Sequence, residues 1–384
     1  MTALPARLAL LAGNFITGLV VMAPAAMLHP LAEGLNVSVR DAGLLVTYGA
    51  VLLSIASPLV AWLTSRVDRR TLLVGSLVTV ALAHLASSFV SSYPAVLVLR
   101  LVMLFFAAVF TPQAAGTVAL LVPEKERPGA IAFVFIGWSL SVAVGMPLMT
   151  YLATSFGWRF AFAALGGAAL VTGLFVFATL PGRLRGAPFS LSSWGEIARD
   201  RVIFILLAIT ILQIGGQLVV FTFMGPSLGL IGAGASIIAL FFALFGVASF
   251  TGNIIASRIV ERLGAFITSG IATGMVATGL LLWAFGGGAL VVMGVGVVVW
   301  GLGFAAANAM QQARLYGAAP ALAAVTVALN TSAVYIGQAA GSYVSGVMFT
   351  RDLAYLMGYA GAGIVLVAWM LWWVTRPRAA VKIA

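Results

Sequence analysis

The ionisable side chains of this chain leave little room for acid–base or metal chemistry. The sequence holds nine carboxylates, two histidines and no cysteine. Hydrolases and metalloenzymes need such groups gathered in a buried site. The carboxylates instead stand apart between long uncharged stretches, at Glu33, Asp41, Asp68, Glu124, Glu126, Glu196, Asp200, Glu261 and Asp352. Since a glycine-rich phosphate loop is also absent, we expect neither an enzyme nor an ATP-driven pump, and no metal or cofactor.

Arg100 is the one arginine that falls inside a predicted apolar span. A charge at membrane depth costs ~3 kcal/mol or more, so it normally faces a cavity or a partner. We expect Arg100 to face the outer part of a central cavity; the alternative is a structural arginine that caps backbone carbonyls. His84 and Arg100 are each eight residues from Ser92 and therefore share a depth. A proton-relay role for His84 competes with simple packing.

Uncharged polar residues recur at helical spacing, so that each set points one way. Together they predict a wet central cavity; the alternative is hydrogen bonding between helices, worth ~0.6 kcal/mol each. Trp138, with Ser141 three residues further on, is the aromatic residue we most expect to touch a substrate. The predicted cavity residues are Asn14, Thr17, Tyr48, Arg100, Phe106, Phe110, Gln113, Trp138, Ser141, Gln213, Gln217, Trp300, Asn308, Gln311, Asn330 and Gln338.

The elements that must position these side chains are membrane-spanning helices. The chain is 62% apolar and 8% charged, with a mean hydropathy of +1.15. Apolar stretches of about 20 residues cross a bilayer as helices, which satisfy their own backbone groups in lipid. We predict an all-α membrane protein with about twelve spans, roughly at 8–28, 41–63, 72–91, 94–122, 129–153, 159–180, 202–223, 233–256, 265–285, 288–313, 321–348 and 353–375.

The placement of lysine and arginine predicts the orientation of these spans. If the N-terminus is cytoplasmic, sixteen of the 20 Lys and Arg lie in inner loops and only Arg40, Arg159 and Arg351 in outer ones. This bias predicts a multi-pass protein of the cell (inner) membrane with both termini cytoplasmic. A cleavable signal peptide would leave eleven spans and reverse the bias, so we expect the first helix to be retained. The net charge of +11 then faces anionic lipid, not nucleic acid.

The chain divides into two similar halves. A polar inner stretch, 181–201, separates six predicted spans from six. Asp68-Arg69 follows span 2, and Glu261-Arg262 follows span 8, 193 residues later. Two six-helix repeats joined by an inner linker are the layout of a rocking transporter with its site at the membrane midplane. The predicted parts are an N-terminal bundle, a cytoplasmic linker and a C-terminal bundle, at 1–180, 181–201 and 202–384.

An ordered set of short motifs covers nearly the whole chain: Leu35-Asn36-Val37-Ser38, Gly43, Tyr48, Pro58, Asp68-Arg69, Arg100, Gly145-Met146-Pro147-Leu148, Gly157-Trp158-Arg159 and Leu329-Asn330-Thr331-Ser332-Ala333. This set resembles the major facilitator superfamily, in its drug/proton antiporter branch, which includes sugar-efflux (arabinose-efflux-like) permeases. The resemblance implies two pseudo-symmetric six-helix bundles and a secondary carrier that exports a small molecule, such as a sugar-like metabolite or a drug, by alternating access.

The resemblance also implies roles for particular residues. An arginine at the position of Arg100 faces the central cavity and is linked to coupling. Charges at the positions of Asp68 and its neighbour tie the inner helix ends together in the outward-open state. The implied gating residues are Asp68, Arg69, Glu261, Arg262, Gly145 and Pro147. Gly137, Gly145, Gly337 and Gly341 are further expected to allow close helix approach between the halves.

Coupling and substrate stay open at this stage. Proton antiport would need Glu33, Asp41, His84 or Arg100, because no acid lies inside a predicted span; Asp41 is equally explained as the N-cap of span 2. A uniporter or importer of a small neutral or anionic metabolite is the alternative, and a channel or sensor a remote one. We expect the partners to be a small-molecule substrate and the lipid bilayer, with a monomeric carrier.

Overall fold

The computed structural model describes residues 3–64, 67–123, 126–184, 200–319 and 323–376, and within these ranges it contains helices and turns but no strand. The first half of the chain forms α1 (Ala3–Ala26), α2 (Leu28–Leu35), α3 (Val39–Leu63), α4 (Arg69–Phe89), α5 (Tyr93–Leu120), α6 (Arg127–Leu140), the π-helical turn η2 (Ser141–Gly145), α7 (Met146–Phe156) and α8 (Trp158–Thr179). The second half forms α10 (Arg201–Phe221), α11 (Met224–Leu230), α12 (Ala235–Gly286), α13 (Leu290–Ala318), α14 (Ala323–Thr350), the 3₁₀ turn η4 (Ala354–Leu356) and α15 (Met357–Val374).

Ten of the described helices are long and apolar enough to cross a membrane. One of them, α12, is 52 residues long and contains two predicted spans, because Gly264 (φ 75°) interrupts it. The uncharged, 28-residue α14 is a further candidate by its sequence. With α12 counted as two spans and α14 added, the helices match the twelve predicted spans, and the predicted all-α membrane fold is confirmed.

One predicted boundary is wrong. We expected a loop between spans 8 and 9, from about residue 257 to 264, but α12 stays helical up to Gly264. Ser257 to Leu263 contain no glycine or proline, so nothing breaks the helix before that glycine. Glu261 and Arg262 therefore lie on the helix and not in a loop.

The helix ends follow local chemistry. The carboxylate of Asp68 caps α4 by accepting a hydrogen bond from the backbone N–H of Thr71 at 3.1 Å. Asp200 caps α10 in the same way, through the N–H of Val202 at 2.8 Å. Each cap satisfies a helix N–H that would otherwise lack a partner. Two of the nine carboxylates thus stand at helix starts for a structural reason.

The two halves repeat the same packing. A Cβ placed on Gly137 of α6 would overlap the backbone of Leu11 in α1, and one placed on Gly337 of α14 would overlap the backbone of Ile211 in α10. Both glycines and both contacted residues are 200 positions apart. Glycine allows such close backbone approach because it has no side chain. The pseudo-symmetry of the two bundles therefore extends to this pair of equivalent helix contacts.

These contacts also correct an expectation. Gly137, Gly337 and Gly341 bring together helices of the same half, since Gly341 lies against Gly215 of α10. Gly145 likewise packs against Leu19 of α1. These glycines lie on the sides of α6, η2 and α14 that face the first helix of their own bundle. The predicted close approach between halves is not made by them.

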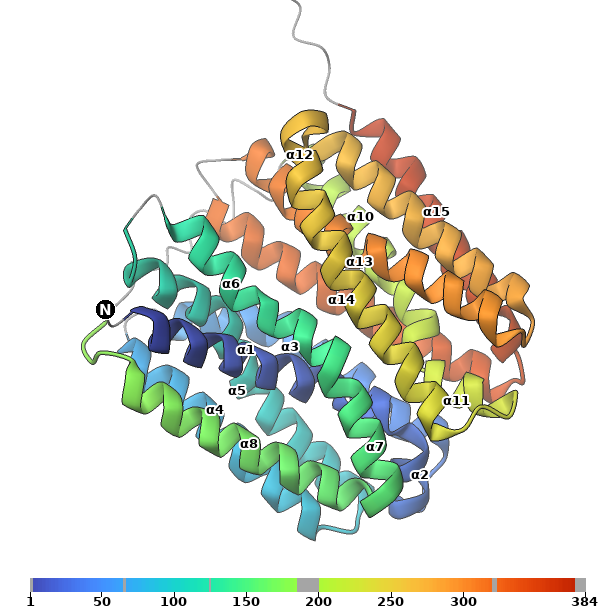
Figure 1. The fold of residues 1–384 in the computed structure, drawn as a ribbon, viewed down its shortest axis with the longest axis horizontal. Coiled ribbons are helices and arrows are strands. Elements are labelled where there is room, and N and C mark those ends of the chain that lie inside the picture. The colour runs from blue at the N-terminus through green and yellow to red at the C-terminus, as the bar shows by residue number, and fades with distance from the viewer. Residues whose placement is uncertain (1–2, 65–66, 124–125, 185–199, 320–322, 377–384) are drawn as a thin grey trace, which may run out of the picture.

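The halves meet mainly along two pairs of segments, α3 with α14 and η2–α7 with α12. Figure 1 shows the blue-to-green bundle and the yellow-to-red bundle coming together around α2, α7 and α11. At this end a Cβ on Gly43 of α3 would touch the ring of Phe223, 2.7 Å away, beyond α10. We call this end of the molecule the α2–α11 end, and the opposite one, which carries the starts of α1 and α10, the linker end.

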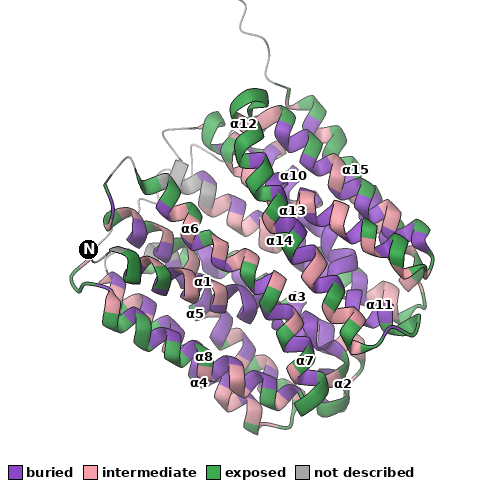
Figure 2. Cartoon of the chain, in the orientation of Figure 1, coloured by how far each residue is buried: buried purple, intermediate pink, exposed green. Residues whose placement is uncertain are grey.

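The outer surface is apolar, as a bilayer requires. Figure 2 shows exposed residues on the outward sides of the helices and buried ones where helices meet. Phe89 is 85% exposed and Val291 80%. A protein surrounded by water rarely exposes so much contiguous apolar surface. The surface therefore agrees with the sequence in placing these helices in lipid.

Candidate substrate site and gate

Arg100 is held by backbone carbonyl groups of two other helices. Its guanidinium donates to the carbonyls of Val20 at 2.6 Å, Val21 at 2.8 Å and Leu45 at 3.3 Å, and the side chain is 1% exposed. Pro24 has no N–H, so it cannot occupy the Val20 carbonyl four residues earlier in α1. Arg100 thus takes the place of the missing helical hydrogen bond. This is the carbonyl-capping geometry of the structural alternative; a role in transport stays a prediction.

His84 is buried between α4 and α8. Its Nδ1 lies 3.0 Å from the carbonyl oxygen of Val80, and its ring meets the ring of Phe162 edge-on at 5.4 Å. The other ring nitrogen, Nε2, has no hydrogen-bond partner. No hydrogen bond joins His84 to Arg100 in the described part of the chain. The contacts of His84 are those of a packed side chain.

The polar residues of the first half form a closed hydrogen-bond network. Asn14 donates through Nδ2 to the carbonyl of Val134 at 3.0 Å and accepts through Oδ1 from Thr111 at 2.7 Å. The indole N–H of Trp138 donates to the Thr111 hydroxyl at 3.1 Å. The network joins α1, α5 and α6 and brings two predicted residues, Asn14 and Trp138, together through Thr111. Sequence reasoning missed Thr111, whose signal was a hydroxyl beside Pro112.

Three further predicted residues satisfy their hydrogen bonds within their own bundle. Thr17 and Ser141 donate to carbonyls one turn earlier on their own helices. Gln113 donates to the hydroxyl of Thr64, linking α5 to α3 at 3.2 Å. Such bonds are the ordinary way in which polar side chains join helices in lipid. Thr17 and Ser141 thus bond within their own helices, and Gln113 joins two segments of the first half.

Among the predicted cavity residues, those of the second half are less well paired. Thr210 donates to Oδ1 of Asn330 at 2.8 Å, and the indole N–H of Trp300 donates to Oε1 of Gln217 at 2.7 Å. The buried amide nitrogens Nε2 of Gln213 and Nδ2 of Asn330 have no hydrogen-bond partner. A buried amide donor without a partner is costly, because water has been removed and nothing replaces it. These two amide groups are therefore unpaired hydrogen-bond donors in this conformation.

The remaining predicted cavity residues are scattered. Asn308 has a buried side-chain oxygen without a partner, and Gln338 is buried in α14. Gln311 donates to the carbonyl of Leu206 at 2.6 Å and so binds α13 to α10 near the linker end. Tyr48 and Phe106 are exposed, whereas Phe110 is buried and its ring occupies the space beside Gly13. Phe106 and Phe110 thus have different surroundings although they are four residues apart.

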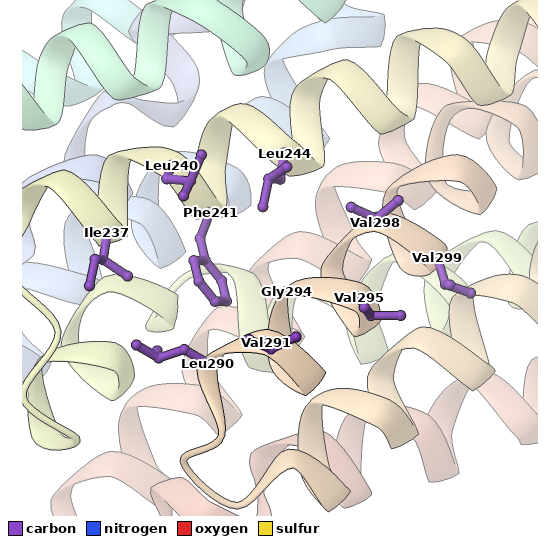
Figure 3. A pocket seen from close by; sticks show the side chains of 10 residues that line it. All are labelled: Ile237, Leu240, Phe241, Leu244, Leu290, Val291, Gly294, Val295, Val298 and Val299. Carbon is purple, nitrogen blue, oxygen red and sulfur yellow. The ribbon is translucent and has the colours of Figure 1, made fainter.

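A separate apolar groove lies between α12 and α13. It has a volume of about 490 Å³, and Figure 3 shows that only aliphatic side chains, a glycine and Phe241 line it. None of the predicted cavity residues contributes to it. Its lining offers no hydrogen bond to a polar solute.

Two predicted proton carriers lie at the α2–α11 end. Glu33 is exposed on α2. Asp41 accepts a hydrogen bond from the Ser38 hydroxyl at 2.7 Å, and its own N–H donates to the same hydroxyl at 3.0 Å. The Ser38 hydroxyl thus accepts from the N–H of the third helical residue, as the side chain of an N-cap residue does. The suggestion that Asp41 is itself the N-cap is therefore wrong: α3 begins at Val39, and Ser38 takes the capping position.

The predicted gating charges lie at the linker end. The pKa of Asp68 is below its ordinary value of 3.8. Partial desolvation raises this pKa, but hydrogen bonds from Thr71 and from the backbone of Arg183 and Leu184 together lower it by more. The N–H of Arg69 donates to the carbonyl of Leu184 at 2.8 Å. Asp68 and Arg69 thus hold the first residues of the linker against the start of α4. In the described residues no ion pair connects them to Glu261 or Arg262, which are exposed on α12.

Gly145 and Pro147 mark an irregular part of a membrane-spanning helix. Between α6 and α7 the backbone widens into the π-helical turn η2, two residues before Pro147. Such turns and prolines weaken the regular hydrogen bonding of a helix and bend it. Here Gly246 of α12 lies directly against the backbone of Ala143, so that a Cβ on this glycine would overlap it. This irregular segment of the first half is thus in direct contact with the second half.

The chain belongs to the Major Facilitator Superfamily, whose profile matches residues 10–342. A Bacillus subtilis relative, the uncharacterized MFS-type transporter YbcL, is 25% identical over 377 residues and 96% of each chain. The probable sugar efflux transporter of Mannheimia succiniciproducens is 26% identical over 93% of this chain and 90% of its own. The inner membrane transport protein YdhP of Escherichia coli K12 is 26% identical over 94% and 93%.

Solved structures show the same fold. A D-xylose-proton symporter superposes with a TM-score of 0.80 at 16% identity, covering 97% of this chain and 98% of its own. A bacterial homologue of the lysosomal transporter Spinster, in an inward-facing and occupied conformation, gives 0.75 over 96% of both chains. The protein is thus a multi-pass membrane transporter of small molecules that works by alternating access, and the prediction that it is not an enzyme is confirmed.

Proposed function

We propose that this transporter exports a small, neutral, oxygen-rich solute, such as a sugar-like metabolite, from the cytoplasm. The observation that carries the proposal is the pair of unpaired, buried amide donors on Gln213 and Asn330. Hydroxyl and carbonyl oxygens are the acceptors that such N–H groups require. The export direction is supported by the relative described as a probable sugar efflux transporter.

The halves at 1–180 and 202–384 are the two bodies that rock in this proposal, with 181–201 as their cytoplasmic linker. The charge bias of the loops supports a cytoplasmic position for the linker end. The tight contacts around Phe223 then close the outer side, which supports an inward-facing state. A reporter enzyme fused to the C-terminus should be active in the cytoplasm; activity of that fusion only outside the cell would reject this orientation.

The substrate class is tested by replacing the unpaired donor. Gln213→Met keeps the size of the side chain and removes its N–H group. We expect affinity for monosaccharides to fall about tenfold while thermal stability is unchanged or raised, because an unsatisfied donor has been removed. The measurements are thermal-shift titration with a monosaccharide panel and uptake of the same sugars by everted membrane vesicles.

A matched control separates binding from folding. Asn14→Leu removes an amide whose nitrogen and oxygen both form hydrogen bonds within the first half. We therefore expect this variant to have a lower melting temperature than the parent protein. Tetraphenylphosphonium, a cation without hydrogen-bonding groups, is the contrasting probe and should bind both variants as it binds the parent protein. Unchanged sugar binding by Gln213→Met, or stabilisation by tetraphenylphosphonium alone, would reject the proposed substrate class.

A further inference from the structure

A rigid aromatic stack covers the end of α15. The ring of Trp372 stacks on Phe266 of α12, with centroids 4.5 Å apart and planes at 14°, and Trp369 stacks on Trp372 at 5.8 Å and 18°. Both indole N–H groups donate to carbonyls of α12, Trp372 to Phe266 at 2.8 Å and Trp369 to Gly270 at 3.0 Å. Gly270 leaves the space that the Trp372 ring fills. The rings are therefore fixed in place.

Two arginines accompany this stack. The guanidinium of Arg314 lies 5.3 Å from the Phe266 ring and that of Arg376 lies 5.7 Å from the Trp373 ring. Arg314 donates to Oε1 of Gln311 at 3.1 Å and to the hydroxyl of Thr375. Both acceptors are neutral, and in the described part of the chain no carboxylate forms an ion pair with either arginine. The nearby C-terminal ends of α13 and α15 supply only partial negative charge.

The surroundings of these residues are those of a membrane interface. Trp373 is 59% exposed and Trp369 40%. Met370 and Val374, which are next to these tryptophans in the sequence of α15, are also exposed. The exposed surface of α15 near its C-terminal end is therefore apolar. Tryptophan gathers at the level of lipid headgroups, and basic residues at that level attract anionic lipids. A cation with free N–H groups thus stands beside a fixed aromatic surface.

We propose that this group, the α15 cluster of Phe266, Arg314, Trp369, Trp372, Trp373 and Arg376, binds the headgroup of an anionic phospholipid. Guanidinium groups bind phosphate oxygens with two parallel hydrogen bonds and remain charged at the interface. The lipid phosphate supplies the negative charge that the described protein residues do not. The tryptophan rings contact the glycerol region and the first methylene groups of the acyl chains. The site is independent of the transported solute.

The test compares two lipids that differ in headgroup charge. The purified full-length protein is titrated in mixed detergent micelles with palmitoyl-oleoyl phosphatidylglycerol or palmitoyl-oleoyl phosphatidylcholine, and retained lipid is counted by native mass spectrometry. We expect a preference for phosphatidylglycerol that falls about fivefold in Arg314→Gln and in Arg376→Gln. Arg314→Lys keeps the charge and should retain most of the preference.

The control is Arg351→Gln, which removes a charge that is exposed like that of Arg376 but lies at the other end of α15, and it should leave the preference unchanged. Equal retention of both lipids by the parent protein overturns the proposal. So does an equal loss in Arg351→Gln, because the attraction would then be general to the net charge. If Arg314→Gln does not fold, the exposed Arg376→Gln decides alone, and an unaltered preference in that variant rejects the site.

Discussion

At the scale of single residues, Arg100 and Pro24 act together. Proline leaves the carbonyl of Val20 without its helical partner, and Arg100 supplies the missing donor. Removing Arg100 leaves the buried Val20 carbonyl unsatisfied, at a cost of ~1–3 kcal/mol. We therefore expect Arg100→Ala to lower the melting temperature and to abolish transport.

A second substitution tests whether Arg100 compensates for Pro24. Pro24→Ala restores a backbone N–H that can reach the Val20 carbonyl, so the double variant Pro24→Ala/Arg100→Ala should melt at a higher temperature than Arg100→Ala. Thermal unfolding of the four proteins in the cycle measures this coupling. Additive effects would show that Arg100 does not compensate for the proline.

Asp68 is a second residue with a measurable signature. Its carboxylate caps α4 and its pKa is below 3.8. A lowered pKa in the folded state contributes stability that is present above 3.8 and is lost as the pH falls through the folded-state value. Asp68→Ala should cost ~0.5–2 kcal/mol near neutral pH. Asp68→Asn should keep the cap, yet flatten the loss of stability on acidification below pH 4; an unchanged acid profile would contradict this.

At the scale of elements, η2 of the first half and α12 of the second half are in backbone contact at Gly246. A side chain at Gly246 would overlap the backbone of Ala143, and overpacking of this kind costs ~1–3 kcal/mol. Gly246→Ala should therefore disfavour the conformation closed at the α2–α11 end by about tenfold or more. Gly116 of α5 has open space around it, so Gly116→Ala is the matched control.

The chain contains no cysteine, which makes labelling straightforward. Met224 is buried in α11 at the closed end. A Met224→Cys reporter should react faster with a thiol reagent in the Gly246→Ala background than in the Gly116→Ala background. Equal rates would mean that this contact does not govern closure.

At the scale of the whole molecule, the distribution of acids bears on the driving force. Among the described residues the carboxylates lie at helix ends or exposed positions, including Glu33 and Asp41 at the α2–α11 end. A proton carrier normally needs an ionisable group at membrane depth. We expect proteoliposomes to move a verified substrate to the same final level with and without an imposed pH gradient. Accumulation against a concentration gradient would instead establish the proton antiport that family resemblance suggests.

The sequence by itself determined the helical membrane fold, the twelve spans and the division into repeats. These properties depend on local composition: the length of an apolar stretch and the position of charges are readable one segment at a time. The polar residues around Glu261 predict a loop, but α12 continues through them to Gly264, because polar residues alone do not end a helix.

Only the tertiary structure decided what each polar side chain touches. Periodicity showed that Gln213 and Gln217 share a helix face, but not that one is bonded to Trp300 while the other has a free amide nitrogen. The sequence left two possible surroundings for Arg100, and the packing of α5 against α1 brings it to the Val20 carbonyl that Pro24 leaves free. The glycines of α6 and α14 turned toward their own bundles. Helix rotation and register arise from packing between segments distant in the chain, so no single stretch of sequence contains them.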